Sequence, residues 1–498
     1  MAIPLMTQER PQPNRGSRQS GDLMEHLLRR AGFGATQAEI DAFKEMGYEA
    51  AVDSLLNFEE QPDDVDSLIG RQGYALTSGG FAPNTIIAHA RQRWLFRMVH
   101  SPRPLQEKMA LFWHNHFATA VSKIQGAFGS EEGTRYMAAT PGTDPAGVRG
   151  QIELFRRQGL GNFRELLEAV AKDVAMVVWL DGRTNIKGKP QENFARELME
   201  LFTMGVDTFP ESDVYAGARV FTGWNVARVT ANAATPYWQF SYNAAQHDTD
   251  AKEFSFPIYP DGGRRIAARS AASGLQDGID LITAVARHPA TGPRLARKLY
   301  KFFISEVGDP DEGFISALAR TYYETGFQIK PMVRQILLSP QFMTGRSHYE
   351  RYSWPAEFVA RTIKEVGWAG FNLNDALTPM ANMGQTLFEP PDVAGWELGP
   401  AWFSSGSMLV RMNFAAQISA NQKFNLRDAT RPYATSPDVM VDFLLERLTS
   451  QPFTTEARAA LLDYARAGGS WTGSDTQRAT KASGLVHLIV GSGNYQLV

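Results

Sequence analysis

The sequence predicts a mainly α-helical protein, a large multi-helix bundle with a small β-hairpin insertion. Three observations support this fold class. Apolar residues recur at intervals of three and four along most of the chain, as on the buried face of a helix. Proline, glycine and capping residues separate these segments at helix-like distances. Only the region around residues 237–256 alternates aromatic with polar side chains, as a strand does.

The first part of the chain is expected to contain helices on both sides of an irregular connection. Residues 22–57, 86–100 and 104–117 have helical spacing. Residues 121–147 are rich in glycine and proline, so we expect an irregular segment there, of the kind that forms a lid or a site wall. Asn162 is expected to cap the next helix, and Pro190 to begin a polar helix that follows it.

The remaining elements are a further helix, a hairpin and a second helical region. Residues 211–222 are expected to form the helix, and Tyr237–Tyr242 and Glu253–Phe256 the two strands of the hairpin. Helical spacing then returns over residues 276–306, 312–325, 329–338, 350–366, 405–420, 436–448, 454–466 and 475–490.

Chain length predicts more than one packed unit, because 498 residues exceed what a single hydrophobic core usually supports. We divide the chain into a disordered tail (1–20), an N-terminal helical sub-bundle with a polar central helix (21–210), a connecting region with the hairpin (211–275) and a C-terminal helical sub-bundle (276–498). No stretch is apolar over the roughly 20 residues that a membrane-spanning helix requires.

Composition excludes several classes of function. The 50 basic and 53 acidic residues are mixed along the chain and give a net charge of -3, which argues against a nucleic-acid partner. The chain has no cysteine, so thiol nucleophiles, disulfides and cysteine-ligated metals are excluded. Phosphate-binding loops, dinucleotide fingerprints and Gly-x-Ser-x-Gly elbows are also missing from the sequence.

The polar helix carries the densest group of candidate site residues. Asn193, Glu197 and Glu200 share one face, while Glu192, Arg196 and Glu200 form a ladder of opposite charges four residues apart. That ladder is typical of an ordinary exposed helix. The flanking segments are apolar, however, and buried carboxylates need partners or a metal. Both interpretations remain open at this point.

Two histidines are candidate metal ligands. His114 and His116 lie two residues apart, so on a regular helix their side chains point about 200° apart, and both reach one ion only if the helix ends there. Together with Glu197 and Glu200 they would offer nitrogen and oxygen ligands suited to a divalent transition metal such as zinc, iron or manganese. The alternative is that they are hydrogen-bonded core residues.

Further candidates lie outside these two helices. His247 and Asp248 are placed in the loop between the expected strands, where they are candidates for proton transfer, and Lys252 is a candidate anion-binding residue. Arg196 is a candidate for stabilising an oxyanion. Asn193 and Trp224 complete the expected substrate site, the tryptophan by stacking on a sugar ring.

Several segments together resemble a bacterial family of domains of unknown function, DUF1800. The resemblance rests on residues 26–34 (HLLRRAGFG), 112–117 (FWHNHF), 193–201 (NFARELMEL), 221–224 (FTGW), 247–252, 288–299, 390–396 (PPDVAGW) and 408–415 (MLVRMNFA). It implies a large, mainly helical bacterial protein, often exported and often encoded beside a sulfatase-like or phosphatase-like partner. It implies no established reaction.

The chain departs from the family pattern in two places. The family commonly has histidine where this chain has Phe202, which removes a possible ligand or proton carrier. Residues 1–19 lack the apolar core of a secretory signal. We therefore expect a periplasmic or extracellular protein if a signal has been trimmed, and a cytoplasmic one otherwise.

Two functions follow as hypotheses. The first is metal-assisted hydrolysis of an anionic or glycan-type substrate, in which Glu197, Glu200 and an imidazole hold the ion. His247 or Asp248 then moves protons, and Arg196 stabilises the oxyanion. The second is a non-catalytic binding or assembly role beside a sulfatase-like or phosphatase-like protein, with the same polar residues forming buried ion pairs.

Overall fold

A computed structural model describes residues 19–230, 235–344, 347, 348, 350–420, 424–449 and 453–498. Over these residues the chain forms 24 α-helices and two small two-stranded antiparallel sheets, which confirms the predicted fold class. The tail predicted over residues 1–20 lies outside the described residues except for its last two, with which the first helix begins. No helix of the described chain is long and apolar enough to cross a membrane.

The elements follow one another along the chain in this order. The first half contains α1 (Gln19–Arg30), α2 (Gln37–Met46), α3 (Tyr48–Leu56), α4 (Ile87–His100), α5 (Pro104–His116), α6 (Val121–Phe128), α7 (Ser130–Ala138), α8 (Gln151–Gln158), α9 (Phe163–Ala171), α10 (Val174–Trp179), α11 (Asn193–Glu197), α12 (Glu211–Val220), β1 (Trp224–Val229) and β2 (Tyr237–Tyr242). The second half contains β3 (Lys252–Glu253), β4 (Arg265–Ile266), α13 (Leu275–Arg287), α14 (Thr291–Phe303), α15 (Glu312–Glu324), α16 (Ile329–Leu337), α17 (Pro340–Met343), α18 (Pro355–Val366), α19 (Asn374–Asn382), α20 (Ser405–Ala420), α21 (Asn425–Ala429), α22 (Pro437–Leu448), α23 (Thr455–Arg466) and α24 (Asp475–Val490).

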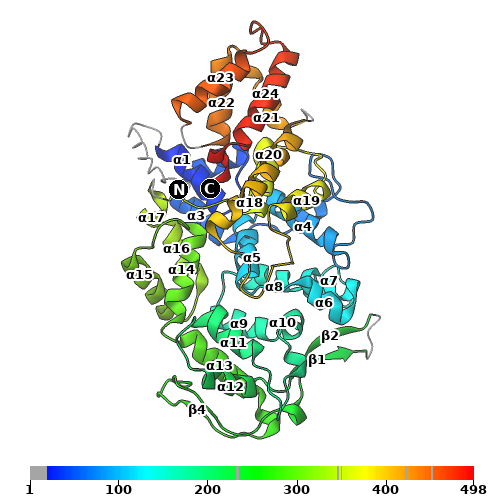
Figure 1. Ribbon diagram of the computed structural model, residues 1–498, viewed down its shortest axis with the longest axis vertical. Coiled ribbons are helices and arrows are strands. Elements are labelled where there is room, and N and C mark those ends of the chain that lie inside the picture. The colour runs from blue at the N-terminus through cyan, green and yellow to red at the C-terminus, as the bar shows by residue number, and fades with distance from the viewer. Residues whose placement is uncertain (1–18, 231–234, 345–346, 349, 421–423, 450–452) are drawn as a thin grey trace, which may run out of the picture.

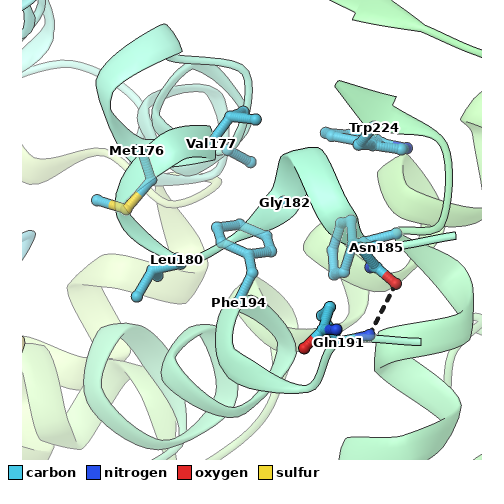
Figure 2. A pocket seen from close by; sticks show the side chains of 10 residues that line it. Met176, Val177, Leu180, Gly182, Asn185, Gln191, Phe194 and Trp224 are labelled. Atoms are coloured by element: carbon cyan, nitrogen blue, oxygen red, sulfur yellow. Dashed lines mark hydrogen bonds between the residues drawn. The ribbon is translucent and has the colours of Figure 1, made fainter. Parts of the chain in front are cut away.

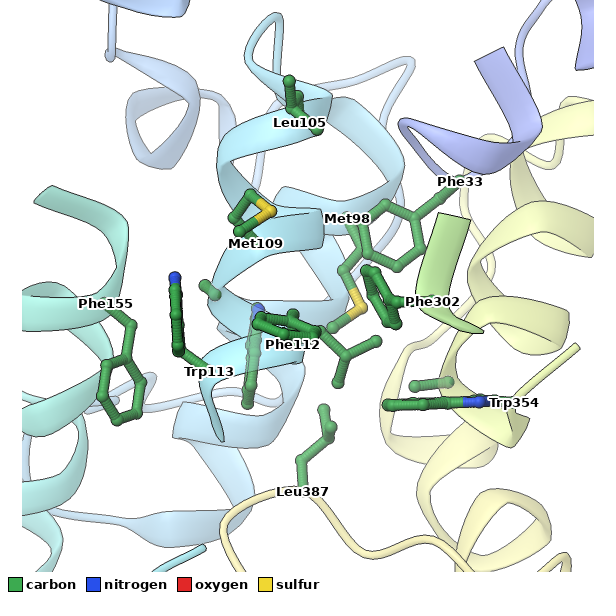
Figure 3. Packing of buried hydrophobic residues seen from close by; sticks show 14 of the residues in the cluster. Phe33, Met98, Leu105, Met109, Phe112, Trp113, Phe155, Phe302, Trp354 and Leu387 are labelled. Carbon is green, nitrogen blue, oxygen red and sulfur yellow. The ribbon is translucent and has the colours of Figure 1, made fainter. Parts of the chain in front are cut away.

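The molecule is elongated, with α5 at its centre (Figure 1). Helices α21–α24 form one end together with α1, and α9–α13 form the opposite end. Proline at the first position of α5 suits a helix start, because the amide hydrogen that it lacks would be unpaired there. α5 is buried on nearly all sides (Figure 3). Phe112 packs on Phe302, which in turn packs on Trp354, and Trp113 points to the other side, towards Phe155.

Residues 121–147 differ from the prediction, because they contain two helices rather than an irregular connection. α6 and α7 are joined at Gly129, whose positive φ of 89° favours glycine. Gly133 lies against the other helix, and a Cβ added there would come within 2.6 Å of the Gln125 Cα. These glycines therefore serve a tight turn and a close helix contact, and they do not break the helices.

The β-hairpin was predicted with one wrong partner. β2 forms where it was expected, but it pairs with β1 in the register Trp224↔Tyr242 and Val226↔Phe240. Glu253 pairs with Arg265 in the second, separate sheet. β2 is nearer along the chain to β1 than to β3, so the loop that joins β1 to β2 is the shorter one. The alternating burial of β1 also suits a strand that pairs with β2.

Several contacts join the predicted sub-bundles. The Lys108 ammonium on α5 is ion-paired with Glu357 on α18, and both side chains are buried. Arg29 Nε donates to Glu365 Oε1 at 3.1 Å across 336 residues of sequence. The division at residues 210 and 275 stays a prediction, and these contacts place charged side chains of both halves in a shared interior.

Candidate functional site

The polar helix begins three residues later than expected and is not a regular α-helix throughout. After α11 the chain continues as a π-helical turn over Leu198–Thr203. Thr203 Oγ1 donates to the Leu198 carbonyl at 2.6 Å, and the Met204 amide to the Met199 carbonyl at 2.8 Å, both five residues back. π-Helical turns are rare and are frequent at functional sites.

His116 lies against this turn and uses both of its ring nitrogens. Its Nε2 lies 3.1 Å from the Phe202 carbonyl oxygen and its Nδ1 3.0 Å from Lys298 Nζ. A carbonyl only accepts hydrogen bonds, so Nε2 carries the proton and Nδ1 accepts from Lys298. The Phe202 side chain is itself fully buried and packs on His116, so this position is part of the site's inner wall.

α14 supplies two basic side chains, one helical turn apart. Arg294 Nη2 donates to the Leu201 carbonyl at 3.3 Å, while Arg294 Nε is buried and has no hydrogen-bond partner. Gly205 leaves room for this guanidinium, because a Cβ there would lie 3.1 Å from Arg294 Nη1. Arg294 and Lys298 are half-buried, as are Glu197 and Glu200.

We call His116, Glu197, Glu200, Arg294 and Lys298 the Lys298 cluster. Lys298 contacts His116 and is affected by the charge of Arg294, whereas Glu200 links the cluster to Glu197, because its charge acts on both Arg294 and Glu197. Burial, followed by the charge of Arg294, lowers the pKa of Lys298 to about 7. Burial, followed by the charge of Glu200, raises the pKa of Glu197 to about 6. An amine and a carboxyl group therefore both titrate near neutral pH, which is typical of acid–base sites.

His114 does not join this cluster. Its Nε2 accepts a hydrogen bond of 3.1 Å from the Phe388 amide, and its ring packs against Trp94 and Trp396. Within the described residues, no three His, Asp or Glu side chains form a group that could hold a metal ion. The donor set predicted from His114, His116, Glu197 and Glu200 is therefore not assembled, and His116 has no free nitrogen to offer.

We expect His114 to make the protein sensitive to acid. Burial lowers the pKa of His114 to about 3. An unfolded imidazole gains a proton below about pH 6.5, whereas the folded one stays neutral to about pH 3. Its contribution to stability is thus complete above about pH 6.5 and falls by about 1.4 kcal/mol per pH unit below it. In urea unfolding, His114→Gln should lose roughly 2 kcal/mol less than the wild type between pH 7 and pH 5.

The glutamine side chain keeps an acceptor for the Phe388 amide but does not titrate. An equal loss in His114→Gln and the wild type would contradict the assignment.

His247, Asp248 and Lys252 belong to a second, separate group. Asp277 on α13 is fully buried and lies 3.3 Å from His247 Nε2 and 2.6 Å from Lys252 Nζ. His247 Nδ1 lies 2.9 Å from the Thr222 carbonyl, so both ring nitrogens face hydrogen-bond acceptors. Burial acts to raise the pKa of Asp277, but hydrogen bonds from His247 and Lys252 hold this pKa below its ordinary value.

Asp248 is held by Arg219 through two hydrogen bonds of 2.7 and 3.0 Å. These two residues, with His247, Lys252, Asp277 and the nearby Arg269, form the Asp277 cluster, in which Arg269 Nη1 lies 3.2 Å from Asp277 Oδ1. The cluster joins α12, β3 and α13, and its charged side chains are paired with one another. This arrangement is typical of a structural ion-pair network.

The three remaining predicted residues lie near the polar helix. Arg196 pairs with Glu192, as expected, but its second partner is Glu211 rather than Glu200. Asn193 Nδ2 donates to Asp181 Oδ2 at 2.8 Å on the exposed side of α11.

Trp224 is 3% exposed and lines a small internal space of about 10 Å³ with Phe194 and Asn185 (Figure 2). That volume is about the size of one water molecule. The Trp224 ring packs edge to face against Phe221 and Phe240, so it fills the core here.

Sequence reasoning missed Asp277, Arg294 and Lys298 as members of these clusters. A signal for Asp277 exists, because it shares a helix face with Leu281 and Ala284, and a lone acid on an apolar face needs a partner. Arg294 and Lys298 are four residues apart on one face of a helix, but nothing in the sequence indicates that this face meets His116.

Comparison with known proteins adds the family. The family model for "Protein of unknown function (DUF1800)" matches residues 26–497, nearly the whole chain. The chain belongs to the DUF1800 family. No curated protein and no solved structure matches it. The DUF1800 match confirms the resemblance but carries no activity, so function has to be argued from the clusters themselves.

Proposed function

We propose that the protein is a hydrolase of small anionic esters and that the Lys298 cluster supplies its general acid and base. The observation that carries the proposal is a half-buried amine that contacts His116 and has a pKa of about 7, together with a half-buried carboxyl group that has a pKa of about 6 and is linked to this amine through Glu200 and Arg294. Two groups whose environments move their pKa values toward the working pH are the usual basis of acid–base catalysis.

Each side chain has a role that its contacts support. His116 Nδ1 accepts one hydrogen from Lys298, which leaves the lone pair of the neutral amine free to take a proton from an attacking water. Protonated Glu197 gives its proton to the leaving oxygen as the ester bond breaks. The half-buried Arg294 guanidinium binds the substrate anion. The proton balance is restored when Lys298 returns its proton to Glu197 through water.

The mechanism has no metal step, because the residues present do not fit a metal. Both nitrogens of His116 are hydrogen-bonded, and Glu197 and Glu200 alone make too few ligands for a catalytic site. Turnover is accordingly expected to survive treatment with EDTA. Loss of turnover on chelation, with recovery on adding zinc or manganese, would overturn this part of the proposal.

The test of Glu197 compares leaving groups. Purified protein is assayed on 4-nitrophenyl and phenyl esters of phosphate and sulfate, with the corresponding glycosides as neutral controls. A 4-nitrophenolate leaves without help from an acid, whereas phenolate needs a proton. Glu197→Gln should therefore lower kcat on the phenyl ester by about 10²–10⁴-fold and change it little on the 4-nitrophenyl ester.

The pH profile gives a second readout of the same step. Wild-type kcat/KM should be bell-shaped with a maximum at about pH 6.5, between the pKa values of the acid and the base. Glu197→Gln should remove the decline on the alkaline side. Equal losses on both esters with an unchanged profile would contradict the acid role, and turnover of glycosides alone would overturn the anionic substrate class.

A non-catalytic assembly role is the second candidate, and the pairing inside the Asp277 cluster favours it. His247 is bonded to Thr222, Asp248 to Arg219, and Lys252 to Asp277. Side chains held by partners in this way suit a structural task better than proton transfer. Under this alternative the protein turns over none of the esters and forms a stable complex with a neighbouring sulfatase-like or phosphatase-like protein in size-exclusion chromatography.

A further inference from the structure

A third group of buried charges lies at the start of α18, away from both clusters described above. We call Arg30, Lys108, Glu306, Arg351 and Glu357 the Glu357 cluster; all five side chains are 0–2% exposed. Glu357 accepts two hydrogen bonds of 2.8 Å from Arg351 Nη1 and is ion-paired with Lys108. Arg30 is the last residue of α1 and belongs to the HLLRRAGFG segment, and it has no role in the proposed hydrolysis.

The hydrogen-bond donors of this cluster outnumber its acceptors. Arg30 Nη2 donates to the Ile304 and Ser347 carbonyls, but Arg30 Nε and Nη1 have no hydrogen-bond partner, and neither does Arg351 Nη2. Both carboxylates of the cluster already have donors, because Glu357 is bonded as described and Glu306 accepts from the Trp354 indole and the Tyr352 amide. Buried donors without acceptors are costly, and a water molecule would bring donors of its own that also need partners.

The two arginines repel each other. Burial, followed by the charge of Arg351, lowers the pKa of Arg30 to about 9, although Glu306, Glu357 and, more weakly, the half-buried Glu350 act in the opposite direction. Arginine keeps its proton in proteins, so the repulsion between the two guanidinium groups is relieved by an anion rather than by deprotonation.

The walls of the cluster limit the size of such an anion. The Arg351 guanidinium lies 4.7 Å from the Phe302 ring and 5.1 Å from the Trp354 ring. These two rings pack edge to face beside α5 in the close-packed core (Figure 3). Close packing of this kind favours a monatomic ion over a tetrahedral one such as phosphate or sulfate.

We propose that Arg30 and Arg351 bind a halide ion, chloride in physiological solution, through Arg30 Nη1 and Arg351 Nη2. The ion links the end of α1 to the start of α18 and so stabilises the folded chain. It is a structural ligand, independent of the proposed hydrolysis at the Lys298 cluster.

The first experiment locates the ion. Crystals of the full-length protein grown in sodium bromide are measured at the bromine absorption edge. An anomalous peak within hydrogen-bond distance of Arg30 and Arg351 supports the proposal. A light atom there without anomalous signal identifies water and overturns it.

The second experiment measures binding in solution. Urea unfolding is followed at constant ionic strength while sodium gluconate, whose anion is too large for the site, is replaced by sodium chloride. Above the dissociation constant, each tenfold rise in chloride should increase the ratio of folded to unfolded protein about tenfold. Equal stability in the two salts would overturn the proposal without reference to any variant.

Variants then assign the effect to Arg30. Arg30→Gln should abolish the chloride dependence. Arg361→Gln is the matched control, because Arg361 is also buried but its Nε, Nη1 and Nη2 all have partners, among them Glu365 Oε2 and the Leu448 carbonyl. This control should be destabilised and keep the full response to chloride. If both variants keep the response, the ion binds elsewhere and the assignment is wrong; if Arg30→Gln does not fold, the bromide and salt experiments on the wild type decide.

Discussion

Replacing Lys298 by methionine is expected to lower kcat for ester hydrolysis by about 10²–10⁴-fold, the usual contribution of a general base. Methionine keeps the length of the side chain and removes the amine. The His116 Nδ1 would then lose its donor, but the imidazole stays hydrogen-bonded to the Phe202 carbonyl and should hold its position. The measurement is steady-state kinetics on the phenyl ester that the wild type turns over best.

Two further variants test whether Lys298 acts as a proton acceptor or only as a positive charge. Lys298→Arg retains a cation for the substrate anion but not a group that takes up protons near pH 7, so KM should stay near the wild-type value while kcat falls as in Lys298→Met. Lys301→Met, at an exposed position on the same helix, should behave as wild type. Full kcat in Lys298→Arg would show that charge alone is needed and would contradict the base assignment.

Removing Glu107 is expected to destabilise the protein by about 3–5 kcal/mol, because it leaves the Nε donors of two buried arginines without an acceptor and takes away a carboxylate that both guanidinium groups share. Glu107 on α5 is fully buried and accepts from Arg97 Nε at 2.6 Å and from Arg156 Nε at 2.9 Å. Glu107→Ala removes both acceptor oxygens at once. The effect should be seen as a lower urea midpoint with an unchanged dependence on urea concentration.

The control for Glu107 is an ion pair on the surface. Glu312 pairs with Arg297, and their side chains are 66% and 43% exposed. Because water and salt screen such a pair, Glu312→Ala should change the free energy of unfolding by less than about 1 kcal/mol. Similar losses in the two variants would mean that burial does not govern the strength of these pairs.

The fold class could be predicted from the sequence because helical periodicity is a local property. The capping box of α2, in which Thr36 and Glu39 bond each other's backbone, and the cap of α9 at Asn162 are both encoded within four residues. The pairing of β1 with β2 and the contact between α6 and α7 were missed. They depend on which surfaces meet in space, and glycine composition alone does not separate a loop from a close helix contact.

The candidate site was predicted in part. Periodicity placed Glu197 and Glu200 on a polar helix, and both belong to the cluster on which the proposed function depends. The π-helical turn was not visible in the sequence, because residues 198–203 have ordinary helical spacing. The bond from Met204 to Met199, five residues back instead of four, is seen only in the folded chain. Lys298 lies 182 residues from His116, so only the folded chain brings the two side chains together.

The contacts of α1 also set an order of events during synthesis. Arg29 donates to the Leu448 carbonyl across 419 residues of sequence. At about 5–20 residues per second, a ribosome needs roughly 20–80 s to cover that distance. Throughout this interval α1, whose Leu27 and Ala31 are fully buried in the finished protein, lacks its contact with the end of α22. The nascent N-terminal segment is thus a natural target for chaperones. The interior around α1 is complete only after the C-terminal helices have been synthesised.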